Sequence, residues 1–160
     1  MVIILMGVTG SGKTTVGRLL SQELGWKFYD ADDFHPPANI GKMKQGIPLG
    51  DDDRIPWLEK LRDLVRTCLE RDENAVLACS ALKEAYREYL LINTQVTLVY
   101  LRGDPDLLRE RLQQRRGHFM DPKLLDSQFA DLEEPQQAVV IDVSPSPGVI
   151  VQSIRSRLGI

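Results

Sequence analysis

The sequence predicts an α/β fold in which a five-stranded parallel sheet carries helices on both faces. Short apolar runs alternate with segments of helical periodicity along all 160 residues. The first run, VIILM at residues 2–6, is continuous, which is typical of a strand covered on both faces. A chain of this length is expected to form a single domain, residues 1–160, whose core needs no metal or disulfide.

The predicted elements follow one another in a regular order. The first strand leads into a helix from about Lys13 to Gly25, because apolar side chains recur on one face and glycine commonly ends helices. A strand at 27–30 follows, and the next helix is expected from Trp57, with Pro56 at its first position. The remaining predicted strands are 75–79, 96–101 and 139–142, and the remaining helices are 83–91, 104–115 and 149–158.

The stretch GVTGSGKT at residues 7–14 has the spacing of a phosphate-binding loop. Its glycines allow a tight turn whose backbone amides point at a phosphate, next to the positive end of the following helix. In such loops Lys13 would reach the β- and γ-phosphates and Thr14 would offer its hydroxyl to Mg²⁺. The strand–loop–helix context predicts a three-layer P-loop NTPase fold. The expected nucleotide-binding residues are Gly7, Val8, Thr9, Gly10, Ser11, Gly12, Lys13, Thr14 and Thr15.

An acidic stretch, Asp30-Ala31-Asp32-Asp33, follows the second predicted strand. A carboxylate at this edge of the sheet can hold Mg²⁺ through water or accept a proton from an attacking hydroxyl. Asp30 and Asp32 lie on the same side of an extended chain, so we select these two, with Asp30 and Thr14 as the metal-binding candidates. The alternative is a solvated acidic turn that caps the next helix.

Residues 31–54 and 116–135 interrupt the alternation, and their apolar and aromatic side chains argue against disorder. We interpret residues 31–54 as a substrate-binding region. His35 is either a site residue or an ordinary polar loop residue, and the aspartates at 51–53 can simply favour a helix N-terminus. Each cation alone can be a solvated surface residue, but together they border one predicted cleft and suit an anionic substrate. These cations are Lys42, Arg54, Lys83 and Arg87.

A basic cluster opens the second interruption, residues 116–135. Arg111 and Arg115 share one helix face, and Arg116 and His118 follow them. We interpret this segment as a lid that brings guanidinium groups onto the phosphates and excludes water. The alternative is a charged helix end, since cations favour a C-terminus.

The composition excludes several classes of protein. A net charge of −3 gives no nucleic-acid or membrane footprint, and the apolar run at 2–6 is too short for a signal or membrane segment. Cys68 and Cys79 lack metal spacing and are expected to be reduced, buried thiols of a cytoplasmic protein. The tryptophans, with Tyr86, Tyr89 and Tyr100, are interpreted as packing residues.

Over nearly its whole length the chain resembles the gluconate kinases, a group of P-loop small-molecule kinases. The resemblance rests on MGVTGSGKTTVG at 6–17, DADDFHPPANIGKMKQGIPLGDDDRIPWL at 30–58, ACSALKEAYREYL at 78–90 and GHF at 117–119. The loop is common to a superfamily, whereas the second and third stretches are far more specific. Gly50 stands where the family commonly has Asn, and Pro37 follows Pro36 after His35.

The resemblance implies an adenylate- and shikimate-kinase-like fold with a lid, a homodimer, and transfer of the γ-phosphate of ATP to the 6-hydroxyl of D-gluconate. It implies that residues 7–14 hold ATP and Mg²⁺ and that Asp32 orients or deprotonates the hydroxyl. It places Arg111 by the adenine and Arg115 or Arg116 on the lid. The residues implied to meet gluconate are Asp30, Asp32, His35, Lys42, Arg54, Lys83, Arg87 and His118.

Two alternatives to gluconate phosphorylation remain open. The acceptor can be another small hydroxylated acid, such as shikimate or a different aldonate, because the sequence does not reveal the pocket shape. The chain can also be a nucleotide switch without phosphotransfer, although the series of acids and cations suits a small acceptor better than a partner surface.

Overall fold

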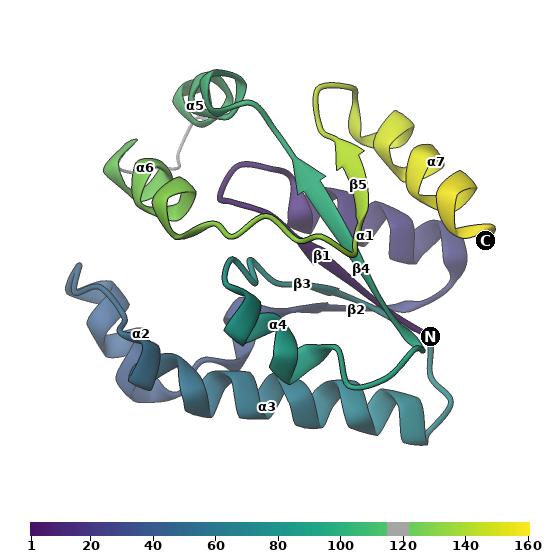
Figure 1. Cartoon of the computed structure of the whole chain (residues 1–160), viewed down its shortest axis with the longest axis horizontal. Coiled ribbons are helices and arrows are strands. Elements are labelled where there is room, and N and C mark those ends of the chain that lie inside the picture. The colour runs from purple at the N-terminus through teal and green to yellow at the C-terminus, as the bar shows by residue number, and fades with distance from the viewer. Residues whose placement is uncertain (115–121) are drawn as a thin grey trace.

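The computed structural model describes residues 1–114 and 122–160, and within these ranges five parallel strands form one sheet in the order β2-β3-β1-β4-β5. The strands are β1 (Val2–Met6), β2 (Lys27–Asp30), β3 (Ala75–Ala78), β4 (Val96–Arg102) and β5 (Val139–Asp142). The helices are α1 (Lys13–Leu24), α2 (Pro37–Lys44), α3 (Asp51–Glu70), α4 (Glu84–Leu90), α5 (Pro105–Gln114), α6 (Pro122–Asp131) and α7 (Pro147–Leu158), and a 3-10 turn, η1, covers Ala31–Phe34. In Figure 1 the sheet lies between α1 and α7 on one side and α3 and α4 on the other.

The central strand β1 is buried over its whole length and serves both layers. Successive side chains of a strand point to opposite faces, so its residues divide between two apolar clusters. Ile4 joins a cluster with Leu61 of α3, whereas Ile3 joins a cluster with Leu20 of α1 and Val151 of α7. The continuous apolar run therefore has the physical cause that the sequence suggested.

The predicted three-layer fold is confirmed, with every strand within one residue of its expected bounds. The first helix begins at Lys13 as expected, and Gly25 ends it in the left-handed conformation, with φ 68°. Among the described residues no helix is both long and apolar enough to cross a bilayer.

The main departure from prediction is α3, which begins at Asp51 instead of Trp57 and carries Pro56 inside it. The extra turn is stabilised from its own first residues. Asp53 accepts a hydrogen bond from the Gly50 N–H at 2.9 Å, and three acidic residues lie at the positive helix end. Pro56 lies beyond the first turn of α3, so the Asp52 carbonyl loses the N–H partner that another residue at position 56 would supply, and the helix continues past this loss.

Both sequence interruptions contain helices at the carboxyl-terminal edge of the sheet. Residues 31–54 fold into η1, α2 and the start of α3, and α6 lies within 116–135. In Figure 1, α2 and α6 lie on the left of the molecule, beyond the ends of the strands. This edge is where α/β sheets bind ligands.

Candidate active site

The phosphate loop joins β1 to α1 and turns as its glycines predict. Gly10 and Gly12 have φ of 80° and 93°, in the left-handed region that favours glycine. A Cβ on Gly7 would lie 2.6 Å from the Oγ of Ser11, so the turn leaves no room for a side chain there. The Lys13 ammonium closes the loop by donating to the carbonyls of Gly7 at 2.8 Å and Val8 at 3.1 Å.

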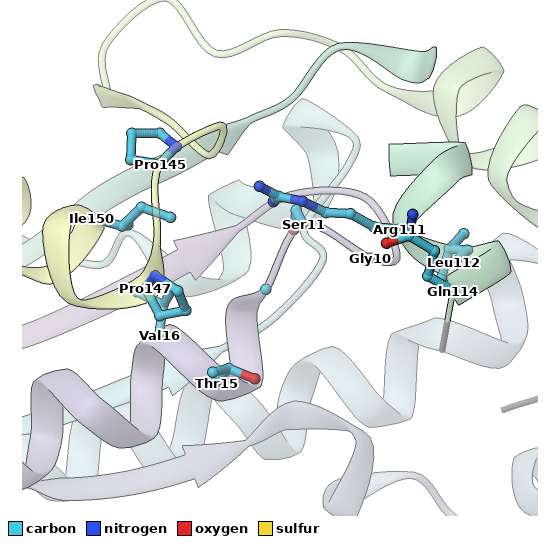
Figure 2. A pocket seen from close by; sticks show the side chains of 11 residues that line it. Gly10, Ser11, Thr15, Val16, Arg111, Leu112, Gln114, Pro145, Pro147 and Ile150 are labelled. Carbon is cyan, nitrogen blue, oxygen red and sulfur yellow. The ribbon is translucent and has the colours of Figure 1, made fainter. Parts of the chain in front are cut away.

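One side of the loop borders a cavity of about 320 Å³. Figure 2 shows Arg111 extending from α5 past Ser11, with Pro145 and Ile150 on the facing wall. The Arg111 guanidinium donates to the carbonyl of Ser144 at 3.1 Å, which fixes it beside the loop. A guanidinium and aliphatic rings suit a planar, partly apolar group such as a nucleotide base.

The other side of the loop borders a cavity of about 310 Å³, lined by Asp30 and Asp32, which we call the acid-side cavity. The Thr14 hydroxyl donates to Asp30 Oδ2 at 3.2 Å, and Asp30 Oδ1 accepts the backbone N–H of Asp32 at 3.0 Å. Lys13 and Ser80 also line this cavity. The structure thus brings Lys13, Thr14, Asp30 and Asp32 together, as the sequence analysis expected.

The electrostatics of this cavity favour a carboxyl group that can take up a proton. Partial loss of hydration raises the pKa of Asp32, repulsion by Asp30 raises it further, and Lys13 acts in the opposite direction. Although Asp32 is exposed by overall area, its carboxyl faces this crowded acidic corner. Burial lowers the pKa of Lys13, whereas Asp32 is the first of the groups that raise it. Burial raises the pKa of the neighbouring Cys79 to about 12, so its thiol stays protonated.

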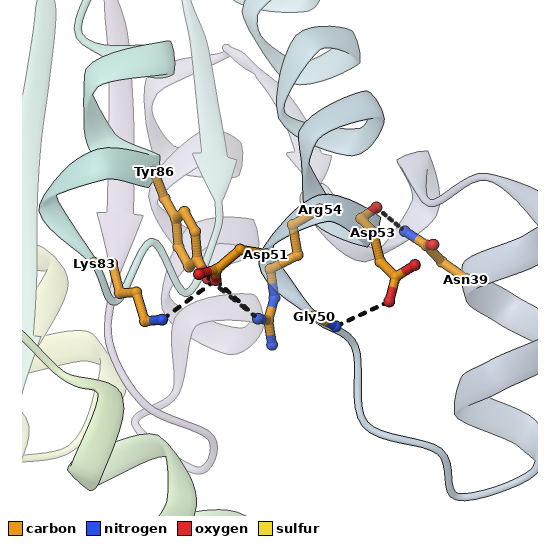
Figure 3. Close-up of polar contacts among 7 residues, drawn as sticks. All are labelled: Asn39, Gly50, Asp51, Asp53, Arg54, Lys83 and Tyr86. Carbon is orange, nitrogen blue, oxygen red and sulfur yellow. Dashed lines mark hydrogen bonds and ion pairs between the residues drawn. The ribbon is translucent and has the colours of Figure 1, made fainter.

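A hydrogen-bonded cluster around Asp51 lies between α3 and α4. The Tyr86 hydroxyl donates to Asp51 Oδ1 at 2.5 Å, and Lys83 Nζ reaches the same oxygen at 3.2 Å. Arg54 lies 3.9 Å from that oxygen and donates to the Tyr86 hydroxyl at 3.1 Å. Figure 3 shows these side chains converging from two helices. The contacts with Tyr86 and Lys83 lower the pKa of Asp51, so it is a carboxylate at neutral pH.

A second cluster lies around Asp53, two residues further along α3. Lys42 of α2 donates to both carboxylate oxygens of Asp53, at 2.9 and 3.0 Å, and the pKa of Asp53 is lowered mainly by this contact. The Asn39 side chain donates to the backbone carbonyl of Asp53 at 2.8 Å (Figure 3). Lys42 is therefore paired within the protein and joins α2 to α3.

His35 and Arg87, both expected to meet the acceptor, have hydrogen-bond partners within the protein. His35 is 9% exposed, stacks on Trp57 with ring centroids 4.4 Å apart, and faces the Asn39 amide through Nδ1. Arg87 is 5% exposed and donates to the carbonyls of Ala81 and Leu82 at 2.9 and 3.1 Å. Both side chains are directed at neighbouring groups of the protein, and their contact with the acceptor stays a prediction.

Arg87 instead holds a strained loop at the cavity edge. Ala81 has φ 45°, a left-handed conformation that costs a residue with a Cβ about 1–2 kcal/mol. Arg87 secures this turn from one side, and the Gly7 N–H contacts the Ser80 carbonyl at 3.3 Å from the other. The segment after β3 is therefore fixed against the phosphate loop.

Sequence reasoning missed the polar roles of three residues. Tyr86 was assigned to packing, and although it is buried, its hydroxyl is central to the Asp51 cluster. Asp51 was considered mainly as helix-end charge and was not selected as a site residue. Gln128 of α6 lines the acid-side cavity, and no local signal distinguished it. Arg115, Arg116 and His118 lie outside the described residues.

The fold and site define the class of this protein as a P-loop kinase. The family model of shikimate kinase matches residues 9–143. A solved shikimate kinase from Bacteroides thetaiotaomicron, 21% identical, matches with a TM-score of 0.69 over 100% of this chain and 99% of that chain, which supports the fold.

More similar relatives narrow the class. The thermosensitive gluconokinase of Escherichia coli strain K12 is 48% identical over 97% of this chain and 86% of its own. The probable gluconokinase of Xenopus tropicalis is 44% identical over 99% of this chain and 93% of its own. The crystal structure of a gluconokinase from Sinorhizobium meliloti 1021, 40% identical, matches with a TM-score of 0.87 over 98% of this chain and 90% of that chain. The chain belongs to the gluconokinase family.

Proposed function

We propose that this protein is a gluconokinase, which transfers the γ-phosphate of ATP to the 6-hydroxyl of D-gluconate to give 6-phospho-D-gluconate and ADP. The observation that carries the proposal is one cavity in which Lys13 of the phosphate loop faces Asp30 and Asp32. A phosphate held by the loop and a hydroxyl held by an aspartate would meet there. The gluconokinase relatives supply the particular acceptor.

The residues of this cavity divide the work of an in-line transfer. Lys13 and the loop amides neutralise and orient the phosphate chain, which is most of what phosphoryl transfer requires. Asp32 orients the acceptor hydroxyl and takes its proton as the oxygen–phosphorus bond forms. Its raised pKa brings it nearer to neutrality than an ordinary aspartate, which favours a group that exchanges protons.

Thr14 and Asp30 fit a Mg²⁺ ion that accompanies ATP. Their side-chain oxygens lie 3.2 Å apart on the acid side of the loop, and both are the hard oxygen donors that Mg²⁺ prefers. When held by Thr14 and Asp30, the ion would supply positive charge that offsets the charge of the phosphates.

The Asp51 cluster is suited to the carboxylate of the acceptor. Lys83, Arg54 and Tyr86 already direct donors to one carboxylate oxygen, that of Asp51. A gluconate carboxylate is the same chemical group, and charge-assisted hydrogen bonds of this kind contribute about 1.5–3 kcal/mol each. Gluconate would share these donors with Asp51 or replace it.

Other parts of the proposal concern the surroundings of the reaction. We place a lid at about 116–135, a homodimer in solution, and the protein in the cytoplasm. The reduced state of Cys68 and Cys79, both free and buried, is in keeping with a reducing compartment. Sedimentation equilibrium at two protein concentrations tests the dimer.

An acceptor screen tests the proposed activity. Purified protein with Mg²⁺ and ATP is given D-gluconate, other aldonates, shikimate or no acceptor, and ADP release is followed by a coupled assay. We expect strong stimulation by gluconate and a product whose phosphorus resonance is that of a primary phosphate ester. Stimulation by shikimate alone would replace gluconate as the substrate, and nucleotide binding without turnover on any acceptor would favour a switch.

A further inference from the structure

Gln128 of α6 connects the phosphate loop to the acid-side cavity. Its Oε1 accepts a hydrogen bond from the backbone N–H of Thr9 at 2.6 Å, across 119 positions of sequence. The same side chain lines the cavity that holds Lys13, Asp30 and Asp32. One side chain therefore contacts the loop and faces the acids opposite it.

The two cavities beside the loop indicate where the phosphate transfer would occur. Both are lined by Gly10 and Gly12, but Arg111 belongs to the first and Asp32 to the second. A nucleotide whose base lies by Arg111 would extend its phosphates along the loop toward Asp32. Its terminal phosphate then enters the cavity that Gln128 lines.

Gln128 is not needed to attach α6 to the rest of the protein. Leu125 is fully buried in the core beneath the helix, and Asp126 pairs with Arg109 of α5 at 2.9 Å. Beyond the helix, the Glu133 N–H donates to the Leu82 carbonyl and its carboxylate accepts the Glu84 N–H, both at 2.8 Å. These contacts hold the segment at both ends, independently of the bond to Thr9.

The chemistry of the amide explains why a glutamine suits this position. The Thr9 N–H is a donor, so the glutamine must present its oxygen to it, which leaves the amide nitrogen with two N–H groups as its remaining polar function. A neutral donor can bond a phosphoryl oxygen without forming an ion pair with Asp30 or Asp32. A glutamate would keep the shape and the acceptor oxygen, but it would add negative charge beside the phosphate.

We propose that Gln128 is a residue of the transfer site, whose oxygen positions the phosphate loop at Thr9 and whose amide nitrogen donates to an oxygen of the transferred phosphoryl group. The expected effect on kcat rests on the proposed kinase function. The expected effect on nucleotide binding can be measured without an acceptor.

Two substitutions separate the donor role from simple anchoring. Gln128→Met keeps the length of the side chain and removes both polar groups, and Gln128→Glu keeps an acceptor for Thr9 and removes the donor. Ser127→Ala is the matched control, because Ser127 is the exposed preceding residue on the same helix. Thermal unfolding of all four proteins shows whether each variant folds.

The kinetic arm measures gluconate-dependent ADP release. We expect Gln128→Met to lower kcat about 10²-fold, as loss of a donor to transition-state charge typically does, with a KM for ATP within about 3-fold of the wild type. Ser127→Ala should stay within about 2-fold, as surface substitutions usually do. A wild-type kcat in Gln128→Met would overturn the inference.

The binding arm uses calorimetry with Mg²⁺ and either ADP or the non-hydrolysable analogue AMPPNP. We expect Gln128→Glu to weaken AMPPNP binding about 10-fold and ADP binding less than about 2-fold, because only AMPPNP places a γ-phosphate by the new charge. Equal losses for both ligands, or unfolding of both Gln128 variants, would identify an anchoring residue instead. If the wild type lacks gluconate-dependent turnover, the proposed function fails while this arm still decides the role of Gln128.

Discussion

The phosphate loop, which is the proposed donor side of the site, and the Asp51 cluster, which is its proposed acceptor side, are built in different ways. The donor side is a backbone structure, in which left-handed glycines shape a loop and Lys13 caps its carbonyls. The acceptor side is a set of side chains from separate helices that already bond to one another, as Lys83 and Tyr86 do to Asp51. The donor side therefore has a fixed shape before any ligand arrives, whereas the acceptor side has its charges satisfied internally.

The two sides therefore differ in how a ligand would bind to them. A phosphate adds to a loop whose shape is already set by local sequence. At the proposed acceptor side, a small acid would compete with the carboxylate of Asp51 for the same donors, so its affinity would be the difference between two similar sets of hydrogen bonds. Changes on the donor side should therefore affect turnover with any acceptor, and changes on the acceptor side should mainly affect KM for the acid.

The largest effect is expected from Lys13→Ala. The substitution removes the cation of the donor side, and with it the charge that neutralises the phosphates as the bond breaks. We expect gluconate-dependent turnover to fall by about 10³-fold or more, which is the effect on kcat typical of a cation that neutralises the transferred phosphate. Steady-state ADP release measures this loss, and circular dichroism checks the fold. Turnover within about tenfold of the wild type would show that the loop amides suffice.

A smaller loss of turnover is expected from Asp32→Asn. The amide keeps the size of the side chain but cannot take the hydroxyl proton, so kcat should fall about 10²-fold while ATP still binds. In the wild type, kcat should rise with pH until Asp32 is ionised, and the raised pKa moves this rise above the range of an ordinary aspartate. A wild-type rate in Asp32→Asn would exclude it as the base.

Tyr86→Phe tests the acceptor side directly. The change removes the hydroxyl that donates to Asp51 and accepts from Arg54, leaving the ring in place. We expect KM for gluconate to rise by less than about tenfold, with kcat and KM for ATP nearly unchanged, because the hydrogen bond that gluconate loses, worth about 1.5–3 kcal/mol in full, is also lost to Asp51 in the free protein.

Tyr89→Phe is the control for this prediction. Tyr89 lies on the same helix, but its ring contacts Arg62 instead of the Asp51 cluster. A rise in KM for ATP equal to that for gluconate in Tyr86→Phe would mean that the hydroxyl supports the whole cavity. The separation between the two sides would then break down.

The fold was predictable because its signals are local. The apolar run of β1 and the Gly25 stop of α1 each lie within a few residues of the element they define. The start of α3 was predicted too late. Pro56 was taken as the first residue of the helix, whereas the bond from the Gly50 N–H to Asp53 stabilises an earlier start. Competing local signals of this kind are resolved by hydrogen bonds that a sequence does not display.

The site was predictable only in part, for the same reason. Asp30 ends β2 and Lys13 follows the loop after β1, and parallel strands bring their carboxyl ends to one edge whatever the side chains are. The partners on the acceptor side join residues 32 to 35 positions apart, as in the bonds from Lys83 and Tyr86 to Asp51. Such pairings depend on how α3 and α4 pack, and no spacing rule reveals them. The sequence around Tyr86 is that of a packing residue, and the polar role of its hydroxyl is visible only in the folded structure.

The smallest effect is expected from the titration of His35, which tests how the acceptor side is held together. Burial first, and Arg54 second, lower the pKa of His35 in the folded protein, whereas the unfolded chain has the ordinary value of about 6.5. Between these two values the unfolded state binds more protons, so stability is complete above about pH 6.5 and is lost as pH falls through that window.

Urea unfolding of the wild type and of His35→Gln at pH 7.5 and pH 5.5 measures this contribution. His35→Gln keeps a polar side chain but does not titrate, so the wild type should lose more stability than the variant between the two pH values. Paired carboxylates such as Asp51 and Asp53 have lowered pKa values, so their contribution is lost only at lower pH. Equal losses in both proteins would show that the stacked imidazole of His35 takes up its proton as readily as in the unfolded chain. The stack on Trp57 would then leave the acceptor side more open to solvent than its burial indicates.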